Sequence, residues 1–249
     1  YSTKTKHHKS INFFLTYGII KKLIKKIKPD VIHAHYLGTF SFLASLTGFH
    51  PFIGTVWGSD IDMFGTRNYF TKYMLKHILN KADFIETPDK TTKEFLVRKY
   101  KIKEQKVDFP YWGIKTTEFE PLKIKKSIDI AYLRKSSEKY STDTFVQAMN
   151  LIKKEIPEFN SILIRKEGYA KVENMIKKYN LDKNINTLKW ANHNEMPLLL
   201  NSSLIYVDSF HRNVPGGGMG ITAMEAMSCG LPVVLANNPG VSDYVKHDY

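Results

Sequence analysis

Short apolar runs alternate along the chain with longer segments whose apolar residues recur at helical spacing. The short runs predict strands at 30–35, 52–56, 84–87, 107–109, 128–133, 161–165, 185–189, 204–208 and 232–236. The longer segments predict helices at 11–28, 39–47, 68–81, 90–100, 142–155, 171–180, 194–202 and 220–229. A polar connector at 118–127, around Pro121, divides these elements into two series.

The order of these elements predicts an α/β protein. Strands that alternate with helices form parallel sheets, which are covered by helices on both faces. The two series therefore predict two Rossmann-like lobes, one at residues 1–126 and the other at residues 127–249. Ligands of open parallel sheets bind beyond the carboxyl ends of the strands, so we expect the functional site in the cleft between the lobes.

The net charge of +13 is concentrated in the first lobe. Residues 1–127 carry 23 Lys and Arg against 11 Asp and Glu, whereas residues 128–249 carry 14 against 13. This asymmetry indicates a lobe that faces something anionic, or, equally well, the solvated surface of a lysine-rich chain. The sequence holds no recognition motif for nucleic acid, so we expect no nucleic-acid partner.

The helix predicted at 11–28 combines lysines with large apolar residues. Lys21, Lys22, Lys25, Lys26 and Lys28 flank Ile19, Ile20, Leu23, Ile24 and Ile27. That pattern is typical of a helix that lies in an anionic membrane surface, and the alternative is a surface helix whose apolar stripe packs on the sheet. The sequence contains no run of about 18 apolar residues, so we expect no membrane-spanning helix. It contains a single cysteine, so no disulfide can form within the chain. We expect a cytoplasmic protein, peripheral at the inner face of the membrane.

A glycine-rich loop follows the strand predicted at 204–208. Its residues are Pro215, Gly216, Gly217, Gly218, Met219 and Gly220, and Ile221 and Thr222 then begin a helix. Glycines let a ligand approach the backbone, and a helix start offers free N–H groups, so a phosphate or diphosphate fits there. A tight turn that binds nothing is the alternative. Glu225, inside this apolar helix, needs a partner, which a sugar or ribose hydroxyl or a structural ion pair would supply.

Two cations and one carboxylate follow other strand ends. Arg134 and Lys139 lie in the loop after the strand at 128–133, where anions bind in such sheets, although a solvated loop is the alternative. Asp60 follows the strand at 52–56 and is a candidate base or hydroxyl acceptor, or else a turn residue. His33 and His35 share one face of a strand, but no cluster with metal-ligand spacing accompanies them, so we expect no metal.

Several segments together resemble family 4 of the glycosyltransferases, which have the GT-B fold. The segments that match in order are 29–35, 55–60, 110–121, 134–139 and 225–234. The resemblance implies that Arg134 and Lys139 bind the donor diphosphate and that Glu225 binds the ribose hydroxyls. It also places His35, Trp57, Gly58 and Ser59 on the acceptor side. Gly217 stands where the family usually has a Glu, and Trp57 stands where it has a His.

The resemblance implies a retaining transferase that moves a sugar from a nucleoside diphosphate sugar to a hydroxyl. The acceptor expected from the basic first lobe is a lipid-linked or membrane-proximal glycan. No cofactor is expected beyond the nucleotide sugar. Related chains have a further strand and helix before residue 29 and continue past residue 245, so we expect both lobes to be incomplete. A sugar-nucleotide epimerase or phosphorylase of the same fold remains an alternative, as does a non-catalytic nucleotide- or nucleic-acid-binding module.

Overall fold

The protein is described by a computed structural model. It describes residues 9–66, 68–110, 112–136, 140–165, 170–210, 220–238, 241 and 244–245 of the 249-residue chain. The chain divides into two compact units, unit 1 up to Trp112 and unit 2 mainly from Gly113 onward. Each unit contains its own parallel sheet, as the alternation of elements predicts.

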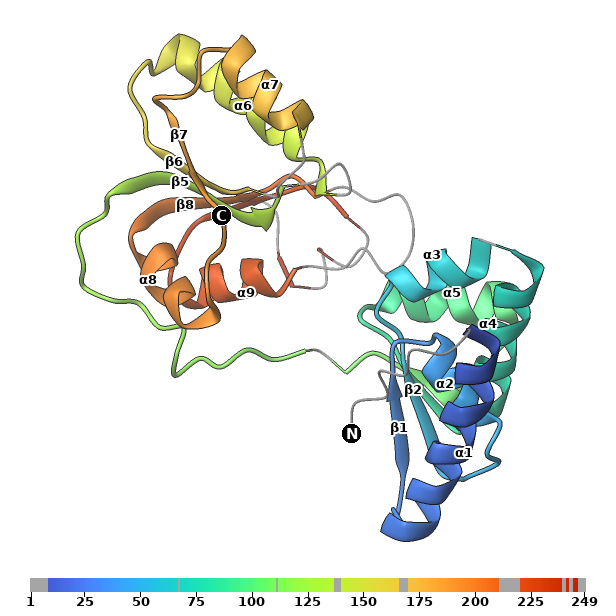
Figure 1. Ribbon diagram of the computed structural model, residues 1–249. Coiled ribbons are helices and arrows are strands. Elements are labelled where there is room, and N and C mark those ends of the chain that lie inside the picture. The colour runs from blue at the N-terminus through green and yellow to red at the C-terminus, as the bar shows by residue number, and fades with distance from the viewer. Residues whose placement is uncertain are drawn as a thin grey trace. The chain divides into compact units, whose positions relative to one another are not determined.

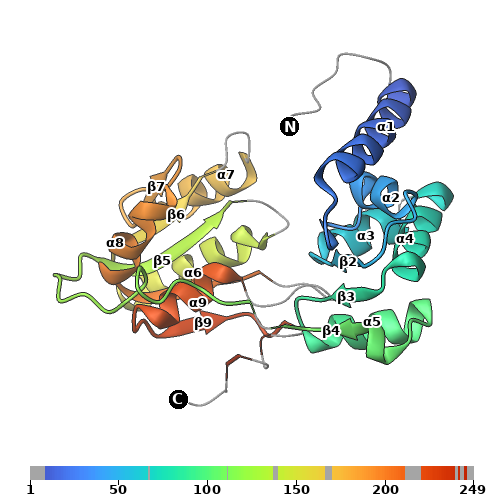
Figure 2. The same ribbon diagram turned by 90° about the horizontal axis from the view of Figure 1, so that it is seen from below.

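Unit 1 is built on a four-stranded parallel sheet in the order β1-β2-β3-β4. The strands are β1 (Ile32–His35), β2 (Phe52–Thr55), β3 (Phe84–Glu86) and β4 (Val107–Asp108). The helices are α1 (Lys9–Ile27), α2 (Thr39–Ser45), α3 (Ser59–Thr66), α4 (Tyr69–Lys81), α5 (Lys90–Tyr100) and the short 3-10 helix η1 (Glu104–Lys106). Helices α1, α2 and α4 lie beside one another (Figures 1 and 2).

The core of unit 1 lies on one face of its sheet. Phe52, Ile85 and Val107 point from the strands into a cluster with Ile78 and Leu96 of the helices. The strands are in sequence order, so successive right-handed crossovers place their helices on the same side. In the described part of unit 1 the sequence-based expectation of two covered faces is therefore not met.

Unit 2 is built on a five-stranded parallel sheet in the order β7-β6-β5-β8-β9. The strands are β5 (Ile128–Lys135), β6 (Ser161–Ile164), β7 (Ile185–Leu188), β8 (Ser203–Asp208) and β9 (Val233–Leu235). The helices are α6 (Thr142–Glu155), α7 (Ala170–Lys178), α8 (Met196–Asn201), α9 (Ile221–Ser228) and the 3-10 helix η3 (His193–Glu195).

Both faces of the unit 2 sheet are covered. Along β5, Ile130 and Tyr132 face one core cluster, whereas Ala131 and Leu133 face another, as the two-residue period of a strand requires. Helices α6 and α7 cover the first face, and α8 and α9 cover the second (Figure 1). The apolar runs predicted as strands are apolar on both sides for this reason.

The direction of chain progression reverses beside β5. From β5 the chain moves outward through β6 to β7, and it then returns to β8 on the other side of β5. The connections that leave the carboxyl ends of β5 and β8 consequently run to opposite faces of the sheet. Such a point opens a crevice between two neighbouring strands, and it is where ligands bind in open α/β sheets.

Two local features are not apparent from the sequence pattern. Helix α3 was not predicted, because its eight residues contain Gly65 and show little apolar repetition. The start of α6 has no side-chain cap, although Ser141 and Thr142 are both good capping residues. Ser141 instead adopts a left-handed backbone conformation, with φ of 51°, and its carbonyl oxygen accepts a hydrogen bond from Ser209.

Candidate functional site

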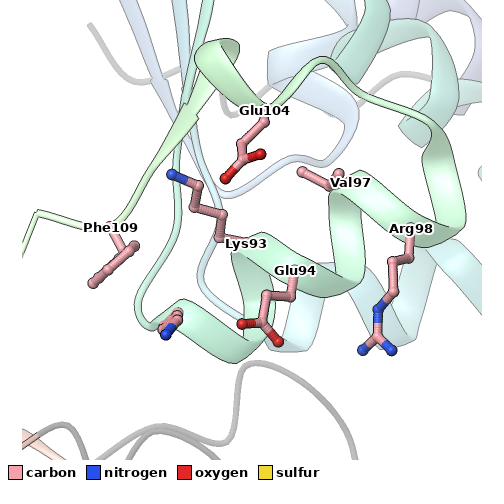
Figure 3. A pocket seen from close by; sticks show the side chains of 7 residues that line it. Lys93, Glu94, Val97, Arg98, Glu104 and Phe109 are labelled. Atoms are coloured by element: carbon pink, nitrogen blue, oxygen red, sulfur yellow. The ribbon is translucent and has the colours of Figure 1, made fainter.

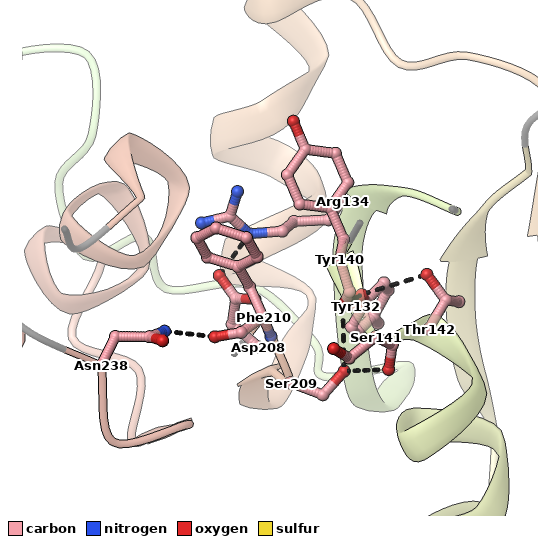
Figure 4. A network of polar contacts seen from close by, with 9 residues as sticks. All are labelled: Tyr132, Arg134, Tyr140, Ser141, Thr142, Asp208, Ser209, Phe210 and Asn238. Atoms are coloured by element: carbon pink, nitrogen blue, oxygen red, sulfur yellow. Dashed lines mark hydrogen bonds and ion pairs between the residues drawn. The ribbon is translucent and has the colours of Figure 1, made fainter. Parts of the chain in front are cut away.

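Arg134 lies at the carboxyl end of β5, on the reversal point of the unit 2 sheet. Its Nε donates a hydrogen bond to the carboxylate of Asp208, which ends the neighbouring strand β8. Its guanidinium lies over the rings of Tyr140 and Phe210, with centroid distances of 5.0 and 4.9 Å (Figure 4). A cation packed on aromatic faces and paired through Nε keeps a fixed orientation.

The loop that follows β5 is attached to the sheet from both sides (Figure 4). The Tyr132 hydroxyl donates to the Tyr140 carbonyl oxygen at 2.8 Å, and the Ser209 hydroxyl donates to the Ser141 carbonyl oxygen at 2.8 Å. The Asp208 carboxylate also accepts a hydrogen bond from the Phe210 N–H at 3.0 Å. The first two bonds and the Arg134–Asp208 pair join the ends of β5 and β8, so the side chain of Arg134 is attached to rigid elements.

The first turn of α9 lies against Arg134. A Cβ atom on Gly220 would overlap a terminal nitrogen of the guanidinium, so glycine lets the two approach closely without a shift of the Arg134 side chain. Ile221 and Thr222 follow as the first residues of α9, where the backbone N–H groups have no partner within the helix. The positive end of the helix dipole and the Arg134 charge therefore act at one place, which favours an anion such as a diphosphate.

Glu225 is buried inside α9, with 4% of its surface exposed. Burial raises the pKa of its carboxyl group, and the neighbouring imidazole of His193 opposes that shift. The Glu225 Oε1 atom lies 3.9 Å from His193 Nδ1, beyond hydrogen-bond distance. A buried carboxylate held by one distant partner has accepting capacity left for hydroxyl groups of a ligand.

Sequence reasoning missed Asp208 and Tyr206, both on β8. The Tyr206 hydroxyl is fully buried, and it has no hydrogen-bond partner among the residues that the structure describes. Burial raises the pKa of Tyr206 well above its usual value, and Asp208, Arg134 and Glu225 all act on it electrostatically. A signal was present, because Tyr206 and Asp208 lie in the last three residues of a largely apolar strand that precedes the glycine-rich loop.

Several predicted donor-site residues lie outside the described part of the chain. They are Lys139, Gly216, Gly217, Gly218 and Met219. Of the residues predicted for this site, the structure brings together Arg134, Gly220 and the start of α9, and it places Glu225 one turn further along that helix.

The residues predicted on the acceptor side gather at the carboxyl edge of the unit 1 sheet. His35 ends β1, and its ring centroid lies 6.2 Å from that of Trp57, which follows β2. Gly58 has a φ of +85°, a conformation that glycine adopts without strain, and the chain then turns into α3 at Ser59. Trp57 also contacts Trp112, with centroids 5.0 Å apart. Trp112 lies in the segment 110–121 that resembles the family, but it was not among the predicted site residues.

Asp60 is fully buried and bonded to the backbone of two loops. Its carboxylate accepts hydrogen bonds from Leu37 N at 2.9 Å, Ile61 N at 3.0 Å and Trp57 N at 3.1 Å. Burial raises its pKa, although these backbone bonds act in the opposite direction. The contacts favour the turn-residue alternative, in which Asp60 fixes the loops after β1 and β2.

The face of the unit 1 sheet opposite the core cluster carries a hydrogen-bonded row of polar side chains. His33 Nε2 lies 2.6 Å from the Thr55 hydroxyl, which donates to Glu86 Oε2 at 2.7 Å. Among the described residues, no group of three or more His, Cys, Asp or Glu side chains is arranged to hold a metal ion.

A pocket of about 330 Å³ lies elsewhere in unit 1, along α5 beside β4 (Figure 3). It is lined by Lys90, Lys93, Glu94, Val97, Arg98, Glu104 and Phe109. Charges of both signs line it, and none of the residues predicted from the sequence does.

Comparisons with known proteins bear on the identity of both units. The family described as "Glycosyl transferases group 1" matches residues 114–249, and "Glycosyl transferase 4-like" matches residues 1–87. The chain belongs to the group 1 glycosyltransferases. No curated protein matches its sequence.

Solved structures show the fold of this glycosyltransferase family. Sucrose-phosphate synthase from Thermosynechococcus elongatus is 18% identical, with a TM-score of 0.76 over 93% of this chain and 62% of its own. A glycosyltransferase from Rickettsia africae is 17% identical, with a TM-score of 0.72 over 98% of this chain and 66% of its own. HepE from Anabaena, in complex with UDP-glucose, is 14% identical, with a TM-score of 0.74 over 94% and 66%. The chain thus spans less than two thirds of these structures.

Proposed function

We propose that this group 1 family member is a glycosyltransferase that moves a sugar from a nucleoside diphosphate sugar to a hydroxyl group. The observation that carries the proposal is the position of Arg134 against the N-terminus of α9, where β5 and β8 part. In this proposal unit 2 binds the donor and unit 1 binds the acceptor. The reaction proceeds with retention at the anomeric carbon, as the family resemblance implies.

The chemical task of the donor site is to stabilise a leaving diphosphate. Asp208 occupies the Nε of Arg134, so the two terminal nitrogens of the guanidinium remain for phosphate oxygens. The N–H groups of the first turn of α9 add further donors from fixed positions, which costs no reorganisation during the reaction. Lys139 is proposed as a second cation. With these positive groups, we propose that no metal ion is required.

The nucleoside is proposed to lie along α9. Glu225 accepts hydrogen bonds from the two ribose hydroxyls, and its burial strengthens those bonds because water competes less. UDP and UDP-sugars are the first donors to test, because the HepE structure contains UDP-glucose.

Product analysis with UDP-glucose labelled in the sugar distinguishes the enzyme classes that share this fold. The proposal expects UDP release together with transfer of label to an added glycan or to lipid extract. Conversion of the nucleotide sugar to another nucleotide sugar would show an epimerase, and consumption only with inorganic phosphate would show a phosphorylase. Binding of UDP without turnover on any acceptor would show a non-catalytic module.

We further propose that unit 1 works at an anionic membrane surface on the cytoplasmic side, on a lipid-linked or membrane-proximal glycan. None of the described side chains of α1, residues 13–27, is buried. Phe14 is 73% exposed and Ile27 is 66% exposed, whereas Phe13 packs against the unit 1 core. Part of the apolar surface of α1 therefore remains exposed. None of the helices in the described part of the chain is long and apolar enough to span a membrane.

Charge and aromatic side chains support this surface. Lys21, Lys22, Lys25, Lys26 and Lys28 are all exposed. The ring of Phe42, in α2, contacts three other aromatic rings, with centroid distances between 6.2 and 6.5 Å. These rings belong to Phe13 of α1 and to Phe70 and Tyr73 of α4. Phe70, Tyr73 and the adjacent Tyr69 are themselves more than half exposed. Basic side chains beside exposed aromatic rings suit the interface of an anionic bilayer.

A further inference from the structure

Trp57 and Trp112 meet at the carboxyl edge of the unit 1 sheet. Trp57 follows β2 and Trp112 follows β4, and their ring centroids are 5.0 Å apart with the ring planes inclined at 55°. Two rings at this angle form an open corner. Trp57 is 47% exposed, so a large part of its surface remains available to a ligand.

The corner has polar groups at its rim. The exposed His35 ring lies 6.2 Å from the Trp57 ring, at 73° to it. Ser59, the first residue of α3, lies two residues after Trp57 in the chain and is partly exposed, so we include it in the proposed rim. An imidazole and a hydroxyl each donate and accept hydrogen bonds, so the rim matches a ligand whose edge carries hydroxyl groups.

The corner is also preorganised. The buried carboxylate of Asp60 accepts a hydrogen bond from the Trp57 N–H and another from the Leu37 N–H, two residues after His35. It thereby holds the loops of Trp57 and His35 at fixed positions. Tryptophan itself loses little conformational entropy on binding, because it has only two rotatable side-chain bonds.

We propose that Trp57 and Trp112 bind a pyranose ring of the acceptor, with His35 and Ser59 hydrogen-bonded to its hydroxyls. This proposal rests on the proposed function, in which unit 1 binds the acceptor, and it names the part of the acceptor that is bound. The electron-rich face of an indole attracts the weakly positive C–H groups on the apolar face of a pyranose. The ring hydroxyls then point outward, toward the polar rim. Binding sites for small ligands typically combine an aromatic or apolar surface with a few well-placed polar groups.

The chain offers a built-in reporter for this site. It has three tryptophans, of which two form the corner, and the third, Trp190, belongs to unit 2. Trp190 is 65% exposed and serves as a matched control for the loss of an exposed indole.

The test is a titration of the full chain with cellotriose, followed by tryptophan fluorescence and by calorimetry, with open-chain glucitol as the ligand control. We expect a saturable change in emission with cellotriose and none with glucitol, which carries hydroxyl groups on an open chain and has no pyranose ring. Trp57→Ala and Trp112→Ala should each weaken binding at least tenfold, Trp57→Phe less, and Trp190→Ala not at all. The affinity for UDP should be unchanged in all four variants.

Four results would overturn the proposal. Calorimetric binding of cellotriose that persists in a folded Trp57→Ala/Trp112→Ala double variant would place the glycan elsewhere. Equal responses to cellotriose and glucitol would exclude ring stacking, and no response to cellotriose with or without UDP would exclude the site. If UDP quenched the fluorescence of Trp57 and Trp112 and cellotriose did not, the two tryptophans would be assigned to binding of a nucleobase. A chain that binds cellotriose but not UDP would instead refute the donor proposal alone.

Discussion

At the residue scale, the donor site depends on how few partners its buried polar groups have. Among the residues that the structure describes, the terminal nitrogens of Arg134 have no hydrogen-bond partner, Glu225 has one distant neighbour and the Tyr206 hydroxyl has no partner. A buried polar group without a hydrogen bond costs free energy, so such groups together indicate a place where a ligand completes the bonding.

Tyr206 allows a test that separates binding from structure. If its hydroxyl bonds the donor, Tyr206→Phe should weaken UDP binding by roughly 3- to 10-fold, the equivalent of a neutral hydrogen bond. The melting temperature should stay the same or rise, because a buried hydroxyl without a partner is removed. Unchanged UDP affinity together with a higher melting temperature would show that the hydroxyl is only a structural defect. Tyr179→Phe, in unit 2 at the end of α7, is the control.

Glu225 predicts a pH dependence of donor binding. Burial raises its pKa above the usual value of 4.5, so it takes up a proton at a higher pH than a solvated glutamate does. As the pH falls through that raised pKa, the carboxylate loses its charge and the ribose bonds weaken. The ratio of UDP affinities of the wild type and Glu225→Gln should therefore shrink toward one as the pH is lowered from neutral through that raised pKa, measured by calorimetry. A ratio that is constant over this range would remove Glu225 from the ribose site.

At the element scale, the positions of the helices and strands were predictable, whereas their side-chain partners were not. The apolar periods located every strand of both sheets, because period-two and period-3.6 patterns are local properties of the sequence. Helix α3 was not predicted because its apolar repeat is too short to be recognised in the sequence. The Arg134–Asp208 pair was not predicted, because it joins residues 74 positions apart and local periodicity does not reveal which strands are neighbours.

Asp60, at the start of α3, is predicted to support the loops after β1 and β2 in addition to its candidate catalytic role. Asp60→Ala removes the acceptor for the Leu37, Trp57 and Ile61 N–H groups, and two of these donors are buried. We expect the free energy of unfolding to fall by roughly 3 kcal/mol, measured by urea denaturation. Asp30→Ala, on an exposed position before β1, should change it little. Wild-type stability in Asp60→Ala with lost transfer activity would restore the catalytic role.

At the scale of the whole molecule, the uneven charge predicts where the protein binds lipid. Reversing Lys21, Lys25 and Lys28 to Glu should weaken binding to anionic vesicles by roughly 100-fold or more, because each lysine near such a surface contributes about 1 kcal/mol. Co-sedimentation with phosphatidylserine-containing vesicles measures this, and added salt should reduce the binding.

The matched control for that experiment changes the net charge equally in unit 2. Lys177→Glu/Lys178→Glu/Lys183→Glu reverses three exposed lysines and should leave vesicle binding largely intact. Equal losses in both triple variants would show a response to net charge alone, without a defined surface. Equal sedimentation of the wild type with neutral and anionic vesicles would remove the membrane proposal.

The central claim is that the crevice between β5 and β8 binds a nucleoside diphosphate through Arg134, without a metal ion. Titration calorimetry with UDP, in the presence of a chelator, tests it most directly on the wild type and on Arg134→Ala. A charge-assisted hydrogen bond contributes roughly 1.5–3 kcal/mol, so we expect Arg134→Ala to bind UDP about 10- to 150-fold more weakly. The affinity of the wild type should not depend on the chelator. Equal affinities of wild type and variant, or wild-type binding that appears only when Mg²⁺ or Mn²⁺ is restored, would contradict the account.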